Sequence, residues 1–416
     1  MQLMLKNGTV YGGGISAQQD LHIADGFFTA ETTEPTAFSC DTFAVFPGFA
    51  DVHVHLREPG FSYKETIASG TRACARGGYT DVCAMPNLKP APDCADNLAA
   101  EQAILERDAV IRVHPYGTIT RGEQGEALSD MAALAPNVVA FSDDGRGVQD
   151  ETMMKNAMRE AKRLGKIIAA HCEDNSLLRG GCIHDGAYAA AHGHKGICSA
   201  SEYKPIERDL HLAAETGCAY HVCHVSAKES VALIREAKKA GIDVTCETAP
   251  HYLLLTENDL QEHGRFKMNP PLRSQADRDA LLEGIADGTI DMIATDHAPH
   301  TAEEKSRGLA GSLMGVVGIE TAFPLLYTYL VKKNILSLEK LIALLHDNPC
   351  RRFGIGHDIA VGQSADCTVF DLAAQYTIDP NDFLSMGRST PFEGVPVYGR
   401  CMLTVCGGKI AYNNKK

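Results

Sequence analysis

Residues 48–60 read GFADVHVHLREPG, a β-rich run that ends in a His-x-His pair followed by an arginine. Successive side chains of a strand point to opposite faces, so we expect His53, His55 and Arg57 to share one face. A lone histidine in a strand is usually a packed core residue. Two histidines and a cation on one face, at the end of a strand, instead favour a functional pocket.

Short β-rich runs alternate with longer helical segments between Phe46 and Phe353. Two of the helical segments, 151–164 and 228–240, are rich in Ala, Lys, Glu and Arg and carry apolar residues at helical spacing. The eight β-rich runs cover residues 52–56, 81–86, 113–119, 138–142, 167–171, 220–225, 244–249 and 292–296. This alternation is typical of a parallel α/β protein, and eight units predict a (β/α)8 barrel of the TIM type.

The two ends of the chain differ from this middle part. They contain short β-rich runs broken by glycines, as in 6–14 and 406–412, and carry no chemical motif. We expect residues 1–46 and 357–416 to pair into a small β-sandwich beside a barrel formed by residues 47–356.

The composition is that of an ordinary globular protein, with 44% hydrophobic and 22% charged residues in a chain of 416. A barrel with a small second domain uses this length comfortably. The 39 basic and 53 acidic residues give a net charge of −14, which argues against nucleic acid or an anionic membrane as the partner. An anionic small-molecule substrate would therefore need a locally positive pocket.

Neither a secretory signal nor a membrane helix is expected, because no stretch reaches the roughly 18 to 20 apolar residues that a membrane helix needs. The 14 cysteines are scattered without a Cys-x-x-Cys pair, and Cys83, Cys223 and Cys246 lie within apolar β-rich runs. We therefore expect reduced, buried thiols and a cytoplasmic protein.

Later β-rich runs end in further metal-binding residue types: Asp144, His171, His224 and Asp296. The strands of a barrel end on one rim, so these four side chains are expected to join His53 and His55 there. Neutral imidazoles and carboxylates suit zinc. Six such groups exceed the three that one catalytic zinc uses, so the pattern favours two zinc ions bridged by a carboxylate.

Other histidines fit this set less well. His221 and His297 should point away from the faces of His224 and Asp296, so packing or support of a ligand is expected for both. His251, after the seventh run, is a candidate for similar support. The histidines expected at the surface are His184, His192, His194, His211 and His263.

Seven motifs are specific enough to indicate a family. They are residues 48–60, Met-Pro-Asn at 85–87, Phe-Ser-Asp-Asp-Gly at 141–145, Ala-His-Cys-Glu at 170–173, His-Val-Cys-His-Val-Ser at 221–226, Lys-Met-Asn-Pro-Pro-Leu-Arg at 267–273 and Ala-Thr-Asp-His-Ala-Pro-His at 294–300. By these motifs the chain resembles the bacterial dihydroorotases of the amidohydrolase superfamily over nearly its full length.

The resemblance implies a role for each candidate. His53, His55 and Asp296 would bind one zinc and His171 and His224 the other. Asp144 would bridge the two ions, and the choice of Asp144 over Asp143 rests on the resemblance. Asp296 would also carry the proton in catalysis. The implied substrate-binding residues are Arg57, Asn87, Asn269 and His300.

The implied substrate is anionic, and a guanidinium such as that of Arg57 grips a carboxylate with two parallel hydrogen bonds. The resemblance implies the reversible zinc-dependent cyclisation of N-carbamoyl-L-aspartate to L-dihydroorotate, a step of pyrimidine biosynthesis. Candidate partners are a second copy of the chain and aspartate transcarbamoylase. The alternatives are a hydantoinase or allantoinase, and a non-catalytic barrel that serves as an assembly partner. Residues 308–315 depart from the Ala-Pro-Phe-Gly loop of the family, so backbone contacts to the substrate from this loop are in question.

Overall fold

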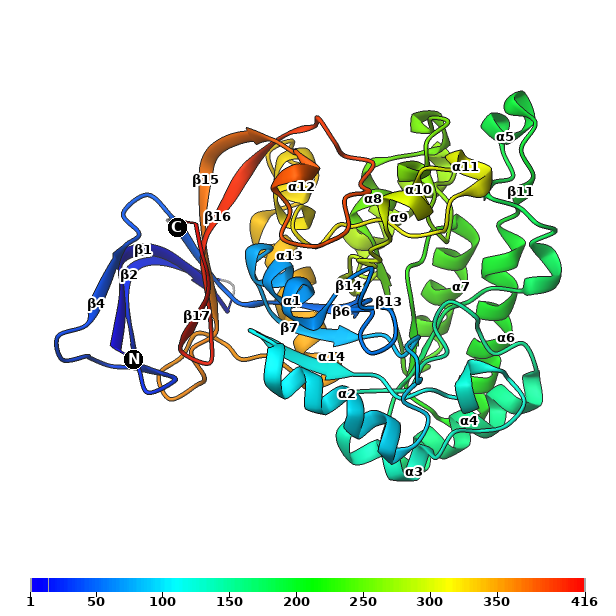
Figure 1. Ribbon diagram of the computed structural model, residues 1–416, viewed down its shortest axis with the longest axis horizontal. Helices are drawn as coiled ribbons and strands as arrows, with labels where there is room; N and C mark the ends of the chain where they lie inside the picture. Colours follow the sequence, from blue (N-terminus) through cyan, green and yellow to red (C-terminus); the bar gives the residue numbers. More distant parts are fainter. Residues whose placement is uncertain (1, 14, 415–416) are drawn as a thin grey trace.

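The computed structural model describes residues 2–13 and 15–414. Figure 1 shows a β-rich part built from both ends of the chain, beside a larger part in which helices surround short strands. The core of the larger part contains seven strands, and every pairing among them is parallel. The parallel α/β class predicted for the middle of the chain is therefore confirmed.

These seven strands form two hydrogen-bonded groups, β6–β7–β8 and β9–β12–β13–β14. Their bounds are β6 (Phe49–Val54), β7 (Tyr79–Ala84), β8 (Arg112–Pro115), β9 (Ile168–Ala170), β12 (Tyr220–Val222), β13 (Val244–Thr248) and β14 (Met292–Ile293). Single bridges join the groups: Phe141 pairs with Gly117 on one side and Ile168 on the other, and Val54 pairs with His297. The pairings therefore run in a closed circuit of eight members, which we call the parallel ring.

The fourth expected strand, 138–142, contributes only isolated bridges to the ring. Its backbone still bonds to both neighbours, because the N–H of Val139 donates to the carbonyl of Pro115 and that of Phe141 to the carbonyl of Ile167, each at 3.0 Å. The sixth and eighth strands end earlier than expected. At His224 and Asp296 the backbone has positive φ values of 35° and 47°, which turn the chain out of the extended conformation.

Helices follow most members of the ring. Their bounds are α1 (Ile67–Arg76), α2 (Ala95–Asp108), α3 (Met131–Leu134), α4 (Glu151–Leu164), α5 (Ala187–His192), α6 (Ala200–Thr216), α7 (Lys228–Lys239), α8 (Pro250–Leu254), α9 (Gln275–Asp287), α10 (Ala302–Lys305), α11 (Gly308–Gly311), α12 (Ala322–Leu326), α13 (Leu338–Ile342) and α14 (Asn348–Phe353). Helix α4 begins and ends as predicted. The Asp150 side chain accepts a hydrogen bond from the N–H of Met153, and Gly165 ends the helix in the left-handed conformation.

The interior of the ring is filled by small and medium side chains rather than by solvent. Val52, Cys83, Ala169, Cys223 and Met292, each from a different strand or strand end, belong to one buried cluster. A second and larger cluster lies between the strands and the helices. The ring is thus a packed core, and a ligand must bind at one of its ends.

Both chain ends contribute to one mixed sheet, which contains β1 (Gln2–Gly12), β2 (Ile15–Ala24), β3 (Phe27–Thr29), β4 (Thr36–Ser39), β5 (Ala44–Pro47), β15 (Cys367–Thr377), β16 (Pro396–Cys406) and β17 (Lys409–Asn413). Strand β5 joins the two ends, because it pairs with β1 on one side and with β15 on the other. Leu5, Ile23, Val45, Val369 and Leu403 are among the buried residues of its own core. A small β-sandwich from both ends was predicted; the structure brings both ends together as expected, but places all eight strands in one hydrogen-bonded sheet.

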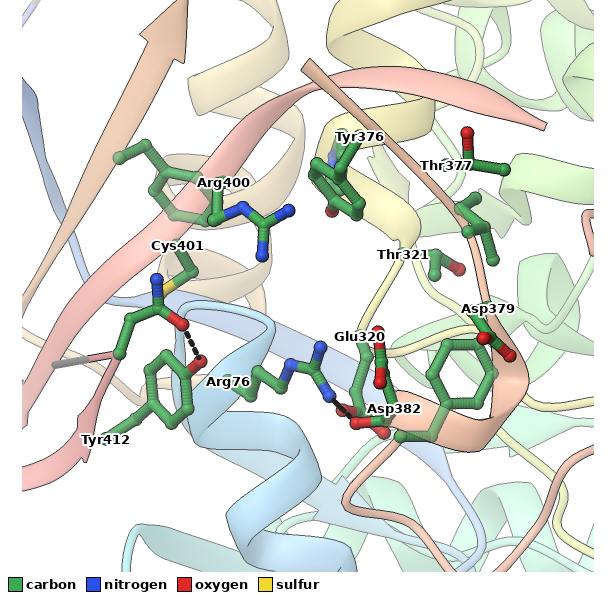
Figure 2. A pocket seen from close by; sticks show the side chains of 15 residues that line it. Arg76, Glu320, Thr321, Tyr376, Thr377, Asp379, Asp382, Arg400, Cys401 and Tyr412 are labelled. Atoms are coloured by element: carbon green, nitrogen blue, oxygen red, sulfur yellow. Dashed lines mark hydrogen bonds and ion pairs between the residues drawn. The ribbon is translucent and has the colours of Figure 1, made fainter. Parts of the chain in front are cut away.

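A small polar cavity lies between this sheet and the larger part (Figure 2). Arg76 from α1 forms an ion pair of 3.0 Å with Glu320 and also bonds to the carbonyl of Asp382. The guanidinium of Arg400 lies 4.3 Å from the ring of Tyr376. The cavity volume is about 50 Å³, enough for a few water molecules but not for a metabolite. The cavity therefore belongs to the packing between the two parts.

Within the described residues, no helix combines the length and the apolar character that crossing a bilayer requires. The cysteine prediction holds for Cys83, Cys223 and Cys246, which are buried and form no disulfide.

Candidate metal centre and substrate pocket

Six candidate ligands converge at one end of the parallel ring. They lie on, or shortly after, five of its eight members. Strand β6 carries His53, and His55 follows directly after it. The other four are Asp144, His171, His224 and Asp296, which follow the fourth, fifth, sixth and eighth members. All six are buried, with exposed fractions between 0% and 6%. Polar groups buried to this degree need hydrogen-bond or metal partners.

The first group of ligand atoms surrounds one oxygen of Asp296. Its Oδ1 lies 3.0 Å from Nε2 of His55 and 3.5 Å from Nε2 of His53. The second group surrounds one oxygen of Asp144, whose Oδ1 lies 3.6 Å from Nδ1 of His171 and 3.7 Å from Nε2 of His224. Asp144 also reaches the first group, at 3.3 Å from His53 and 3.5 Å from His55. Its carboxylate therefore stands between the two groups.

These separations fit zinc. Bonds of about 2.0 to 2.1 Å in a tetrahedral site place two ligand atoms roughly 3.3 Å apart. The ring nitrogens of His171 and His224 that face each other are 2.9 Å apart, a distance at which two imidazoles need a shared proton or a shared cation. Beside them Asp144 Oδ1, like His53 Nε2, is buried without a hydrogen-bond partner among the described residues. A metal ion satisfies these atoms together.

The electrostatics favour cation binding. Burial alone would raise the pKa of Asp144, but the charge of His53 and the ring nitrogens of His171 and His224, 3.6 and 3.7 Å from its Oδ1, lower it well below its usual range. The pKa of Asp296 is also lowered, because hydrogen bonding to His55 and the charge of His53 outweigh the effect of burial. Both carboxylates are therefore ionised at neutral pH.

Asp144, rather than Asp143, faces the histidines. The Oδ1 of Asp143 accepts hydrogen bonds from the N–H groups of Ile119 and Thr120, at 2.8 and 3.0 Å, and its Oδ2 accepts from the Thr120 hydroxyl. Its carboxylate is thus used to fix the loop after β8. The two adjacent carboxylates thus point to different sides, and Asp144, at the start of the turn 144–146, is the one directed toward the histidines.

Glu247 in β13 is a supporting residue that the sequence analysis missed. Its Oε1 lies 2.7 Å from Nδ1 of His53, and its Oε2 lies 3.0 Å from Nε2 of His221. His221 in turn contacts the Thr245 hydroxyl at 2.8 Å. A carboxylate on Nδ1 fixes the tautomer that leaves Nε2 of His53 free for metal. The signal that could have found it was a glutamate inside a β-rich run predicted to belong to the barrel, where a charged side chain needs a partner.

The histidines outside the candidate ligand set lie either in the interior or at the surface. His221 supports His53 through Glu247, as expected for a supporting residue, and the buried ring of His297 lies 3.8 Å from Glu65. His251 is buried against Tyr252. Of the five histidines expected at the surface, His192, His211 and His263 are exposed, whereas His184 and His194 are half-buried against Arg273 and Glu262.

A cavity of about 320 Å³ opens directly above the metal-ligand atoms. Arg57, Asn87, Asn269 and His300, the four predicted substrate residues, all line it. So do five of the six candidate ligands, while His53 lies underneath. Asn87 accepts a hydrogen bond of 2.9 Å from His55, and Asn269 donates one of 2.8 Å to Glu173. The two amides are thus held in place, one by the candidate ligand His55 and the other by Glu173.

Arg57 brings a positive charge to one side of this pocket, and Lys64 lies behind it in an ion pair of 3.0 Å with Glu304. The Nε of Arg57 donates to the carbonyl of Pro299 at 3.2 Å, and Lys64 lies 3.2 Å from Nδ1 of His300. Burial, together with the charges of Arg57 and Lys64, lowers the pKa of His300 to about 3. His300 is therefore neutral, and its Nε2 donates to the carbonyl of Met314 at 2.8 Å. Arg57 is thus the group of this pocket that can supply the local positive charge an anionic ligand needs.

The 308–315 segment reaches the pocket despite its unusual sequence. Met314 and Gly315 line the cavity beside Ala298 and His300. Gly315 has a φ of 128°, and a Cβ there would lie 2.9 Å from the Cβ and the carbonyl oxygen of Ala298. A side chain at position 315 would therefore strain the backbone and push this wall out of place.

The dihydro-orotase-like family model matches residues 43–230. A dihydroorotase from Fusobacterium nucleatum subsp. nucleatum is 54% identical, over 89% of this chain and 88% of its own length. A dihydroorotase from Bacillus cereus (strain AH820) is 47% identical, over 100% of this chain and 99% of its own. Among solved structures, the L-hydantoinase (dihydropyrimidinase) from Arthrobacter aurescens has a TM-score of 0.88 at 25% identity, covering 100% and 96% of the two chains. The fold is shared with hydantoinases, whereas the sequence is far more similar to dihydroorotases.

Proposed function

The chain belongs to the dihydroorotase family of cyclic amide hydrolases, and from this we propose that it interconverts N-carbamoyl-L-aspartate and L-dihydroorotate with two zinc ions bound at the end of its parallel ring. The observation that carries the proposal is the convergence of six buried ligand residues and Arg57 on one cavity. The family supplies the reaction class, and the pocket chemistry supplies the preference for a ring that bears a carboxylate.

The closed circuit of eight parallel members supports a (β/α)8 barrel over residues 47–356. The sheet formed by both ends supports a separate β domain made of residues 1–46 and 357–416. The barrel would thus supply every residue of the reaction, and the β domain would support it from the side.

In the proposed centre, His53, His55 and Asp296 would hold one zinc, His171 and His224 would hold the other, and Asp144 would be shared between them. Glu247 orients His53 from below. Zinc bound there supplies Lewis-acid chemistry, which lowers the pKa of a water molecule and polarises a carbonyl group. The distances around Asp144 and Asp296 support this assignment.

The residues of the chain then perform the proton transfers. Arg57 binds the substrate carboxylate, and the amides of Asn87 and Asn269 contact the carboxylate and the ring. In ring opening, Asp296 accepts the proton of the attacking water and passes it to the ring nitrogen as the amide C–N bond breaks. Ring closure runs the same transfers in reverse, so Asp296 acts as acid in one half of the reaction and as base in the other.

Two rival functions are weaker. A hydantoinase shares the fold and the metal machinery, but neither hydantoin nor dihydrouracil carries the carboxylate that Arg57 is suited to bind. A non-catalytic barrel retained as an assembly partner has no need for six buried ligands, whose burial is costly without a metal. A homodimer, an association with aspartate transcarbamoylase and a cytoplasmic location stay predictions.

The test compares hydrolysis of L-dihydroorotate, hydantoin and allantoin by the purified protein, together with cyclisation of N-carbamoyl-L-aspartate. We expect turnover of the first and last compounds and close to two zinc ions per chain by elemental analysis. Preferred turnover of hydantoin or allantoin would overturn the substrate assignment. Active protein with a single zinc would overturn the binuclear centre.

A further inference from the structure

Lys305, at the end of α10, is a buried cation that the reaction described above does not use. Its exposed fraction is 4%. None of the ion pairs among the described residues involves Lys305, and the carboxylate of its neighbour Glu304 pairs instead with Lys64 and lies near His300. A buried ammonium without a counter-charge is costly, so its hydrogen bonds must compensate.

All three N–H groups of Lys305 have backbone partners. The Nζ lies 2.9 Å from the carbonyl oxygen of Lys267, 2.7 Å from that of Leu313 and 2.7 Å from that of Gly315. An ammonium group has three donors, so its hydrogen-bonding capacity is filled.

The three carbonyls belong to two segments that form one wall of the substrate pocket. Lys267 lies two residues before Asn269, and Leu313 and Gly315 flank Met314. Asn269, Met314 and Gly315 line the cavity. The segments also touch directly, because the N–H of Gly315 donates to the carbonyl of Lys267 at 3.1 Å. The ammonium of Lys305 therefore ties this wall together from behind.

We propose that Lys305 is a positioning residue for substrate binding, which holds Met314 and Gly315 against the segment that carries Asn269. This role explains how the 308–315 segment, with its unusual sequence, still presents a defined wall to the pocket. It rests on the proposed function, since the ligand that the wall contacts is the dihydroorotate ring. Lys305 itself lies behind the wall and touches no reacting atom.

The test uses Lys305→Met, which keeps the length of the side chain and removes the charge and all three donors. The matched control is Lys166→Met. Lys166 also donates to a backbone carbonyl, that of Val138 at 2.6 Å. This contact lies where the fourth and fifth members of the ring begin, at the end of the ring opposite the pocket. Both variants are studied as zinc-loaded full-length protein.

Two measurements are made on each variant. Hydrogen–deuterium exchange without substrate reports on the peptide that contains Gly315, whose N–H is protected only while the two segments stay together. Steady-state kinetics with L-dihydroorotate separate KM from kcat. In Lys305→Met we expect exchange of this peptide and KM each to rise at least about tenfold, while kcat changes less than about threefold. In Lys166→Met we expect neither change.

Unchanged exchange and unchanged KM in folded Lys305→Met would overturn the proposal, as would an equal KM increase in Lys166→Met. If Lys305→Met fails to fold, Lys305→Arg takes its place, because the planar guanidinium cannot direct three hydrogen bonds to the same carbonyls. The same rise in exchange and KM, with little change in kcat, is then expected. Failure of the proposed function would show separately, as absent dihydroorotate turnover in the wild-type protein. The exchange measurement still decides the role of Lys305 in that case.

Discussion

Asp296→Asn is the substitution that most directly tests the proposed proton transfer. The Oδ1 of Asp296 lies 3.0 Å from His55 Nε2 and 3.5 Å from His53 Nε2, so an amide oxygen of the same size can remain in the metal centre. The backbone φ of 47° is one that asparagine adopts readily. The substitution therefore preserves shape and removes only the charge and the basicity of the carboxylate.

The expected loss follows from the role. General acid–base groups typically contribute about 10²–10⁴-fold, so kcat should fall at least about a hundredfold, equivalent to about 2.7 kcal/mol of transition-state stabilisation. KM should change much less, because Arg57, Asn87 and Asn269 are untouched. The split between the two constants distinguishes lost chemistry from lost binding.

The assay measures kcat and KM for L-dihydroorotate together with zinc content and the thermal midpoint. Asp209→Asn is the control, because Asp209 is another buried aspartate, bonded to the Tyr220 hydroxyl at 2.9 Å on the helix side of β12. It should lower the thermal midpoint without a selective loss of kcat. Turnover near wild type in Asp296→Asn with zinc still bound would refute the reasoning, and His300 would be the next group to test.

Three further predictions concern binding, metal affinity and pH. Arg57→Lys should raise KM for L-dihydroorotate at least about tenfold with little change in kcat, since a point charge lacks the planar fork; an unchanged KM would exclude Arg57 as the carboxylate ligand. Glu247→Gln should weaken zinc affinity by about 10–100-fold in metal-buffer titrations, because His53 loses a charged partner, and equal affinity would contradict this support. Burial lowers the pKa of His251 to about 4, so the folded state stays neutral at this ring while the unfolded chain takes up a proton below about pH 6.5. The free energy of unfolding should therefore fall as pH drops from 6.5 to 4. Measured by urea titration, His251→Phe should reduce the slope of the free energy of unfolding against pH by up to about 1.4 kcal/mol per pH unit. Equal slopes in the two proteins would show that His251 titrates normally in the folded protein.

The sequence predicted the parallel α/β class and the positions of most ring members because these depend on local patterns. Helix α4 is an example: residues 151–164 carry apolar residues at helical spacing, and the helix covers this same range. The fourth member could not be assigned as reliably, since its pairing consists of bridges at Phe141 that depend on both neighbours. The early ends of β12 and β14 were also hidden, because a positive φ at histidine or aspartate is set by the surrounding site rather than by local preference.

The metal-ligand candidates were found for a related reason. Strands of a parallel ring end on the same side, so a histidine or an aspartate at a strand end is placed with the others before any distance is known. The same logic cannot separate Asp143 from Asp144, because adjacent residues differ only in the direction of their side chains.

The supporting roles of Glu247 and Lys305 could not be predicted from the sequence. Both are charged and buried. Glu247 lies 194 positions from His53, whereas Lys305 lies 38 positions from Lys267 and joins it to a loop only 8 to 10 positions further along the chain. A charged residue in an apolar strand or beside a pocket motif indicates that a partner exists, because burial without one is costly. The identity of the partner depends on closure of the ring for Glu247 and on the path of two loops for Lys305. Candidate metal and substrate ligands can thus be located from their position at strand ends, whereas the residues that hold those candidates in place can be identified only from the three-dimensional structure.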